Sequence, residues 1–155
     1  MRNTVIINLF SGPGCGKSTS AAQLFYELKK RNYDVELTNE YAKWLVYEEN
    51  YKKIKNQLYL FSKQHNQIFR LNDVVDIVIM DSHNKFSNKN YFIERTTDYV
   101  QEGRYHNLEQ AVEVDNKILN FLDTNSIPYD KVNLTNLIER IFTDLNIPYE
   151  INEKV

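Results

Sequence analysis

Three of the chain's four glycines, Gly12, Gly14 and Gly16, lie within five consecutive residues of the stretch FSGPGCGKST. Glycine adopts backbone conformations that other residues rarely reach, so this spacing predicts a tight loop rather than part of a helix or strand. Lys17 follows the last glycine directly, which places a cation beside the loop. No other stretch restricts the fold of this chain as strongly.

The residues on either side of the loop predict a strand and a helix. Residues 4–10 (TVIINLF) are β-branched and almost continuously apolar, which is typical of a strand buried on both faces of a sheet. Residues 17–32 have apolar side chains at helical spacing and end in the basic run KKR, whose charges favour a helix C-terminus. The predicted local order is strand, glycine-rich loop, helix.

The rest of the chain alternates between strand-like and helical patterns. This alternation predicts an α/β fold with a mainly parallel, five-stranded sheet flanked by helices, and the 155 residues fit a single domain. The further strands are predicted at residues 33–38, 74–81, 91–95 and 129–134. The further helices are predicted at residues 40–50, 53–72, 107–125 and 135–146. On the helix at 53–72, the residues predicted to face the core are Ile54, Leu58, Phe61, Ile68 and Leu71.

Composition excludes several classes of protein. The formal net charge of -2 gives no footprint for non-specific nucleic-acid binding, so a nucleic-acid role would need a local basic patch. No apolar run reaches the roughly 18 to 20 residues of a membrane span, and the N-terminal apolar stretch is too short for a signal peptide. We therefore expect a cytoplasmic protein without a membrane partner. Cys15 is the single cysteine, which excludes an intramolecular disulfide and a thiolate zinc site.

The glycine-rich loop matches the pattern G-x-x-x-x-G-K-[ST], with Ser11 in place of the first glycine. Such a loop turns successive backbone N–H groups inward, beside the positive end of the following helix, and so binds phosphate. We expect Lys17 to reach the β- and γ-phosphates of ATP and Ser18 to be a ligand of Mg²⁺. The residues predicted to bind the nucleotide are Gly12, Pro13, Gly14, Cys15, Gly16, Lys17, Ser18 and Thr19.

A second magnesium ligand is predicted at the end of the most strongly apolar strand. Asp81 closes the stretch VDIVIMD, where a carboxylate would lie near the metal ion of a phosphate-binding loop. Ser82 and His83 follow it, whereas many motor ATPases have a water-activating glutamate there. The sequence therefore favours phosphoryl transfer to a bound acceptor over hydrolysis.

Three further charged residues are candidates for that transfer. Glu40 follows the second strand and is a candidate base for an acceptor hydroxyl, although a carboxylate there could equally interact with a helix dipole. Arg95 and Arg104 bracket a polar segment, with Gly103 as a hinge, and predict a lid at about residues 95–107. The complete predicted catalytic set is Lys17, Glu40, Asp81, Arg95 and Arg104.

The stretches FSGPGCGKST, VDIVIMDS and YFIER resemble those of small P-loop ATP-binding proteins, many carried by bacteriophages, that are often labelled AAA-type but are closer to kinases. The Glu-Tyr-Ala element at Glu40 is similar to one in the nicotinamide riboside kinase domain. A glutamate after the second strand is the base of deoxynucleoside kinases. The resemblance implies that Glu40 is the base and that Asp81 is the metal-associated carboxylate. It also implies that Arg95 and Arg104 are lid arginines.

The link between the third and fourth predicted strands is short, because only residues 82–90 separate them, where relatives usually have a helix. Nine extended residues reach about 30 Å, and a parallel return across two strand spacings takes roughly 20 Å. A parallel fourth strand is therefore within reach, but not through a helix. We predict that part of one sheet face is left uncovered and is masked by another copy of the chain or by a partner.

Together these features predict a kinase of the small-molecule P-loop type. It would pass the γ-phosphoryl group of ATP, with Mg²⁺, to a hydroxyl of a nucleoside-like or nucleotide-like acceptor. Two alternatives stay open: a kinase acting on a modified base or an end of DNA, and a catalytically silent ATP-binding regulatory module.

Overall fold

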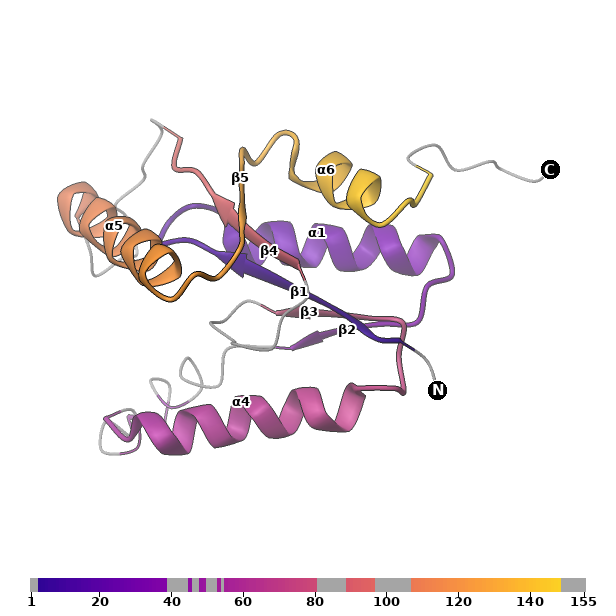
Figure 1. Cartoon of the computed structure of the whole chain (residues 1–155), viewed down its shortest axis with the longest axis horizontal. Coiled ribbons are helices and arrows are strands. Elements are labelled where there is room, and N and C mark those ends of the chain that lie inside the picture. Colours follow the sequence, from indigo (N-terminus) through magenta and orange to yellow (C-terminus); the bar gives the residue numbers. More distant parts are fainter. Residues whose placement is uncertain are drawn as a thin grey trace.

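The computed structural model describes residues 3–38, 45, 48–49, 53, 55–80, 89–96 and 107–148. Five strands form one sheet in the order β2-β3-β1-β4-β5, and every neighbouring pair is parallel (Figure 1). The strands are β1 (Val5–Phe10), β2 (Val35–Thr38), β3 (Ile77–Met80), β4 (Lys89–Ile93) and β5 (Asp130–Val132). The helices are α1 (Lys17–Lys30), α4 (Gln57–Leu71), α5 (Leu108–Thr124) and α6 (Leu137–Asp144). The predicted parallel α/β fold is confirmed.

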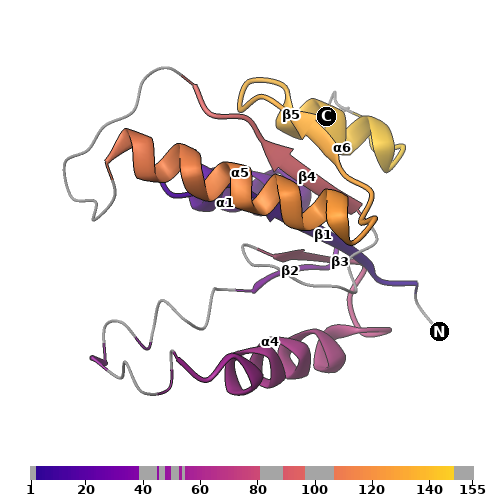
Figure 2. The same ribbon diagram turned by 60° about the vertical axis from the view of Figure 1, so that its left-hand side comes forward.

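The central strand β1 supplies side chains to cores on both faces of the sheet, because successive side chains of a strand point to opposite faces. Ile7 and Leu9 pack with residues of α1 and α6. On the other face, Ile6 packs with α4 and Phe10 packs with α5. The helices therefore cover the two faces in pairs. α1 and α6 lie on one face, and α4 lies on the opposite face (Figures 1 and 2), where α5 packs as well.

The prediction of an uncovered strip on one sheet face is wrong at the three central strands. The residues of β3, β1 and β4 that face away from α1 are at most 7% exposed within the single chain. They are Ile6, Asn8, Phe10, Val78, Met80, Asn90 and Phe92. The reason is that α4 and α5 divide this face between them, α4 on the β3 side and α5 on the β4 side.

The fourth strand is parallel and lies beyond β1, as the length of the link allows, but it begins at Lys89 instead of residue 91. The polar Asn90 hides the start of the strand in the sequence. Its side chain is buried, and its amide donates a hydrogen bond of 2.8 Å to the carbonyl of Pro128 just before β5. A polar residue inside a strand is satisfied here by the neighbouring chain segment.

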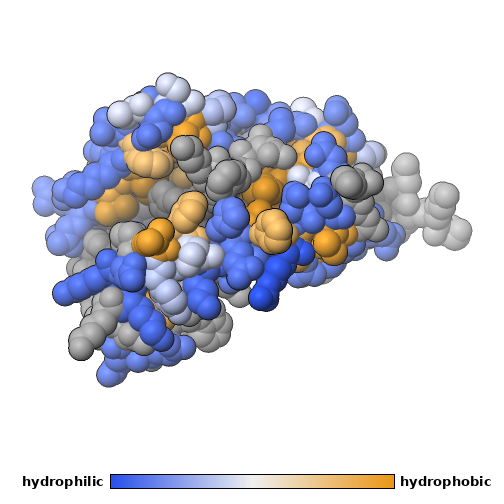
Figure 3. Space-filling model, turned by 60° about the horizontal axis from the view of Figure 1, so that its bottom comes forward, coloured by the Kyte–Doolittle hydropathy of each residue, from blue (hydrophilic) through white to orange (hydrophobic). Residues whose placement is uncertain are grey.

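The prediction for α4 is confirmed only in part. Ile68 is buried and Leu71 packs against the same core, as predicted, and Leu60 is buried as well, whereas Leu58 is 78% exposed and Phe61 is 45% exposed. With Phe69 these two residues form an apolar stripe on the outer surface, and Figure 3 shows hydrophobic side chains among polar ones on this side. No helix within the described part of the chain is long and apolar enough to span a membrane.

Candidate functional site

The loop between β1 and α1 has the backbone that the glycine spacing predicts. Gly14 has a φ of 86° and Gly16 a φ of 74°, both in the left-handed region where a side chain is strained. Gly16 is also the N-cap of α1, so no side chain occupies the cap, and the first turn of α1 carries no acidic residue. The positive N-terminal end of α1 is therefore available to an anion held by the loop.

Lys17 lies across this loop. Its Nζ is 3.5 Å from the carbonyl oxygen of Ser11, which is the first residue of the loop. Ser18 and Thr19 follow on the exposed side of the first turn of α1. Backbone amides, a lysine and a hydroxyl thus lie together at one edge of the sheet. The amides and the lysine can donate hydrogen bonds to phosphate groups, and a hydroxyl can be a ligand of Mg²⁺.

Two residues of the loop have side chains that the core buries. Ser11, which replaces the first glycine of the pattern, is 3% exposed. Cys15 is 3% exposed and packs into the core beneath α1. Burial raises the pKa of the Cys15 thiol, and the nearby Asp115 carboxylate acts in the same direction. The thiol stays protonated and inward, so Cys15 can offer a ligand only its backbone N–H.

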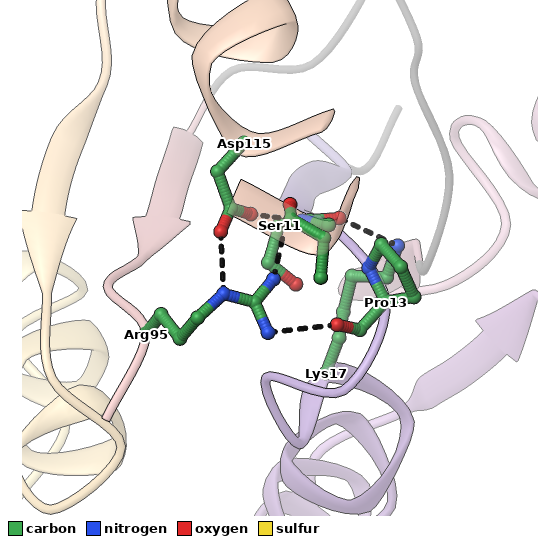
Figure 4. A network of polar contacts seen from close by, with 7 residues as sticks. Ser11, Pro13, Lys17, Arg95 and Asp115 are labelled. Atoms are coloured by element: carbon green, nitrogen blue, oxygen red, sulfur yellow. Dashed lines mark hydrogen bonds and ion pairs between the residues drawn. The ribbon is translucent and has the colours of Figure 1, made fainter. Parts of the chain in front are cut away.

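The loop is held from its other side by an ion pair (Figure 4). Arg95, just after β4, donates from Nε to Asp115 of α5 at 2.7 Å and from Nη1 to the carbonyl of Pro13 at 2.9 Å. A further bond of 3.3 Å runs from Nη2 to the carbonyl of Ala111. Asp115 in turn accepts the backbone N–H of Gly12 at 2.6 Å. One guanidinium and one carboxylate therefore connect β4, α5 and the loop.

Gly12 is a glycine because α5 approaches the loop so closely. A Cβ atom at this position would lie 2.6 Å from Asp115 Oδ1 and 2.9 Å from the carbonyl oxygen of Ala111. The start of α5 is itself fixed by a capping box, in which Asn107 and Gln110 exchange side-chain and backbone hydrogen bonds. The close packing of α5 on the loop thus depends on the absence of a side chain at Gly12 and on the capping box that fixes the start of α5.

The structure places the predicted site residues unevenly. Lys17, Ser18 and Thr19 lie together with the loop. Arg95 was expected to act from a lid, and its guanidinium lies against Asp115 and the loop. Glu40, Asp81, Arg104 and most of the predicted lid lie outside the described residues. The strands that lead to Glu40 and Asp81 end at Thr38 and Met80, which pair in register at the carboxyl edge of the sheet.

Asp115 is the site residue that the sequence reasoning missed. It shares the buried face of α5 with Ala111, Ile118 and Leu122 and is 6% exposed. A single carboxylate at a core-facing position of an amphipathic helix is a signal in itself, because a buried charge needs a partner. That pattern could have identified Asp115, although not its partner Arg95.

Comparisons with known proteins bear on the family and the fold of this chain. The family model for the chromatin associated protein KTI12 matches residues 5–94. A deoxyadenosine kinase from M. mycoides superposes with a TM-score of 0.62 at 17% identity, over 92% of this chain and 99% of that chain. A shikimate kinase from Bacteroides thetaiotaomicron superposes with a TM-score of 0.50 at 12% identity, over the same shares. No curated protein matches the chain. The fold is that of P-loop kinases.

Proposed function

The chain belongs to the KTI12 family, and from this premise and the geometry of the loop we propose that it is an ATP-dependent phosphotransferase. The observation that carries the proposal is the loop itself, with two left-handed glycines, an uncapped helix start and Lys17 lying across it. This arrangement binds the polyphosphate of a nucleotide. Ser18 and Asp81 would hold Mg²⁺, which supplies charge neutralisation at the β- and γ-phosphates when bound.

In the proposed reaction, a hydroxyl oxygen of the acceptor forms a bond to the γ-phosphorus of ATP. The bond from that phosphorus to the bridging oxygen breaks, and ADP leaves with the electron pair. Glu40 takes the proton of the hydroxyl. Lys17 and, from the lid, Arg104 provide positive charge where negative charge develops.

A nucleoside-like or nucleotide-like acceptor is the substrate class we favour. The similar deoxyadenosine kinase was solved with its products dCMP and dCDP bound. In this chain the strands before Glu40 and Asp81 end at the same edge as the phosphate loop, where open α/β sheets bind their ligands. An acceptor held there would lie between the proposed base and the phosphates.

A screen for acceptor-dependent release of ADP tests the proposal. Candidate acceptors are nucleosides, nucleoside monophosphates, nicotinamide riboside and short DNA, each with ATP and Mg²⁺. We expect turnover to be lost in Lys17→Ala and retained in Lys30→Ala, a matched lysine that lies exposed at the far end of the same helix. Glu40→Gln should lose turnover on a hydroxyl acceptor while it still binds ATP. Full turnover in Glu40→Gln would contradict the assignment of the base.

A second candidate function is a nucleotide-dependent binding module. The family is named for association with chromatin, and residues 53–72 of this chain carry lysines and an arginine but no acidic residue. Tight binding of ATP and Mg²⁺ without release of ADP in the presence of any acceptor, together with ATP-dependent binding of DNA, would favour this function over the kinase.

A further inference from the structure

We propose that Arg95 and Asp115 are positioning residues that orient two peptide groups of the phosphate-binding loop, Ser11–Gly12 and Pro13–Gly14. The proposal rests on the proposed function, because it assigns the loop to the phosphates of a nucleotide. It goes further by giving these two residues a role on the side of the loop away from the ligand.

The first peptide group lies between Lys17 and Asp115. Its carbonyl oxygen, from Ser11, is 3.5 Å from Lys17 Nζ, and its N–H, from Gly12, donates to Asp115 at 2.6 Å. In a trans peptide the C=O and N–H point in opposite directions, and none of the peptide bonds described is cis. Asp115 therefore turns the Ser11 carbonyl toward the lysine by holding the opposite end of the same peptide group.

The second peptide group is fixed by Arg95 in the same way. Its carbonyl oxygen, from Pro13, accepts from Arg95 Nη1 at 2.9 Å, so the N–H of Gly14 points away from Arg95. Gly14 is one of the two left-handed glycines, and its amide belongs to the set that the loop offers to phosphate. Without the guanidinium, this peptide group could rotate and remove one donor from that set.

Burial makes both interactions persistent. The side chains of Arg95 and Asp115 are 11% and 9% exposed, and the ion pair between them satisfies charges that would otherwise be buried alone. The close approach at Gly12 shows how tightly α5 packs on the loop, since even a methyl group there would lie 2.6 Å from Asp115. The pair thus sets the loop before any ligand arrives, and a set loop binds phosphate without an ordering cost.

The chain allows an unusually direct test, because its four glycines are Gly12, Gly14, Gly16 and Gly103. Selective ¹⁵N-glycine labelling gives four amide signals. Each glycine follows a different residue type, namely serine, proline, cysteine and glutamate, so carbonyl labelling of the preceding residue assigns every signal.

The variants are Asp115→Asn and Arg95→Lys, with two matched controls. Glu113→Gln removes an exposed carboxylate of the same helix, and Arg140→Lys changes an exposed arginine that also pairs with an aspartate. We expect Asp115→Asn to shift the Gly12 amide signal upfield and Arg95→Lys to shift that of Gly14, with Gly103 unchanged. Each of these two variants should weaken the binding of ADP and of inorganic triphosphate about tenfold, which corresponds to the loss of one charge-assisted hydrogen bond. Neither control should weaken it.

The wild-type protein provides the decisive measurement if a variant does not fold. The Gly12 amide should be strongly protected from hydrogen exchange, because its acceptor is a buried carboxylate. Rapid exchange at Gly12 would overturn the proposal, as would folded variants whose glycine signals and triphosphate affinity match the wild type. Failure of the wild type to bind triphosphate would overturn both proposals. Binding without transfer to any acceptor would overturn only the phosphotransferase.

Discussion

Two arginine–aspartate pairs of similar length lie in different surroundings. Arg95 Nε is 2.7 Å from Asp115, and Arg140 Nε is 3.0 Å from Asp144. The first pair is buried and connects β4, α5 and the loop. In the second, Arg140 is 48% exposed; it pairs with Asp144 within one turn of α6 and lies 3.4 Å from Asp130 of β5. A distance alone therefore does not indicate what an ion pair contributes. Burial decides its effect on stability, and contact with the loop decides its effect on the site.

The largest effect is expected from the removal of the buried carboxylate. Asp115→Ala leaves the Arg95 guanidinium buried without its main counter-charge and leaves the Gly12 N–H without its acceptor. We expect the free energy of unfolding to fall by about 3 kcal/mol, measured by urea denaturation. Glu113→Ala on the same helix is the control and should barely move the midpoint. Equal losses in the two variants would remove the distinction between buried and exposed carboxylates on α5.

A smaller loss is expected when a methyl group is added where α5 meets the loop. Gly12→Ala places a Cβ atom 2.6 Å from Asp115 Oδ1, so the helix or the loop must move. We expect a loss of about 2 kcal/mol in the free energy of unfolding. The same substitution in an Asp115→Ala background should cost less, because the nearest atom is absent. Equal costs in the two backgrounds would show that Asp115 does not set the clearance.

The parts of the fold that the sequence predicts are those with local signals. The strand at residues 4–10 and the loop after it are recognisable because their signals are local: continuous apolar residues, then glycines at fixed spacing before Lys17. The parallel position of β4 follows from the length of the link before it. These features need no knowledge of what packs on them.

The errors and omissions concern contacts between distant segments. Asp115 contacts Gly12 across 103 positions of the sequence, and nothing near either residue indicates the other. On α4 the apolar pattern correctly assigns Ile68 to the buried face, but it also assigns Leu58 and Phe61 to that face, although both are exposed, and it misses the buried Leu60. Periodicity identifies the faces of a helix, and tertiary packing decides which face is buried.

The pH dependence of stability sharpens the comparison at Asp144, the less exposed partner of Arg140. Partial burial acts to raise the pKa of Asp144, but hydrogen bonds from Arg140 and Tyr91 outweigh it and hold that pKa below its ordinary value. A carboxylate whose pKa is lowered by folding stabilises the fold above its unfolded pKa of about 4, and this stability is lost as the pH falls through the folded pKa.

We therefore expect Asp144→Asn to lose about 1 kcal/mol at neutral pH and to show a shallower decrease in stability below about pH 4. Tyr91→Phe, which removes one of the two donors, should change the acid limb in the same direction and by less. Urea denaturation at a series of pH values measures both. An acid limb identical to that of the wild type in Asp144→Asn would contradict the assignment.

The smallest effect is expected at Arg140. Its side chain is about half exposed, and water and salt screen its interactions with Asp144 at 3.0 Å and Asp130 at 3.4 Å. We expect Arg140→Ala to change the unfolding midpoint least among the variants of these two ion pairs, and the change to vanish in high salt. Arg95→Ala should lose more stability in any salt, since its partners are buried and poorly screened. Equal, equally salt-dependent losses at the two arginines would mean that burial does not separate the pairs, and the role of Arg95 as an anchor of the loop would lose its physical basis.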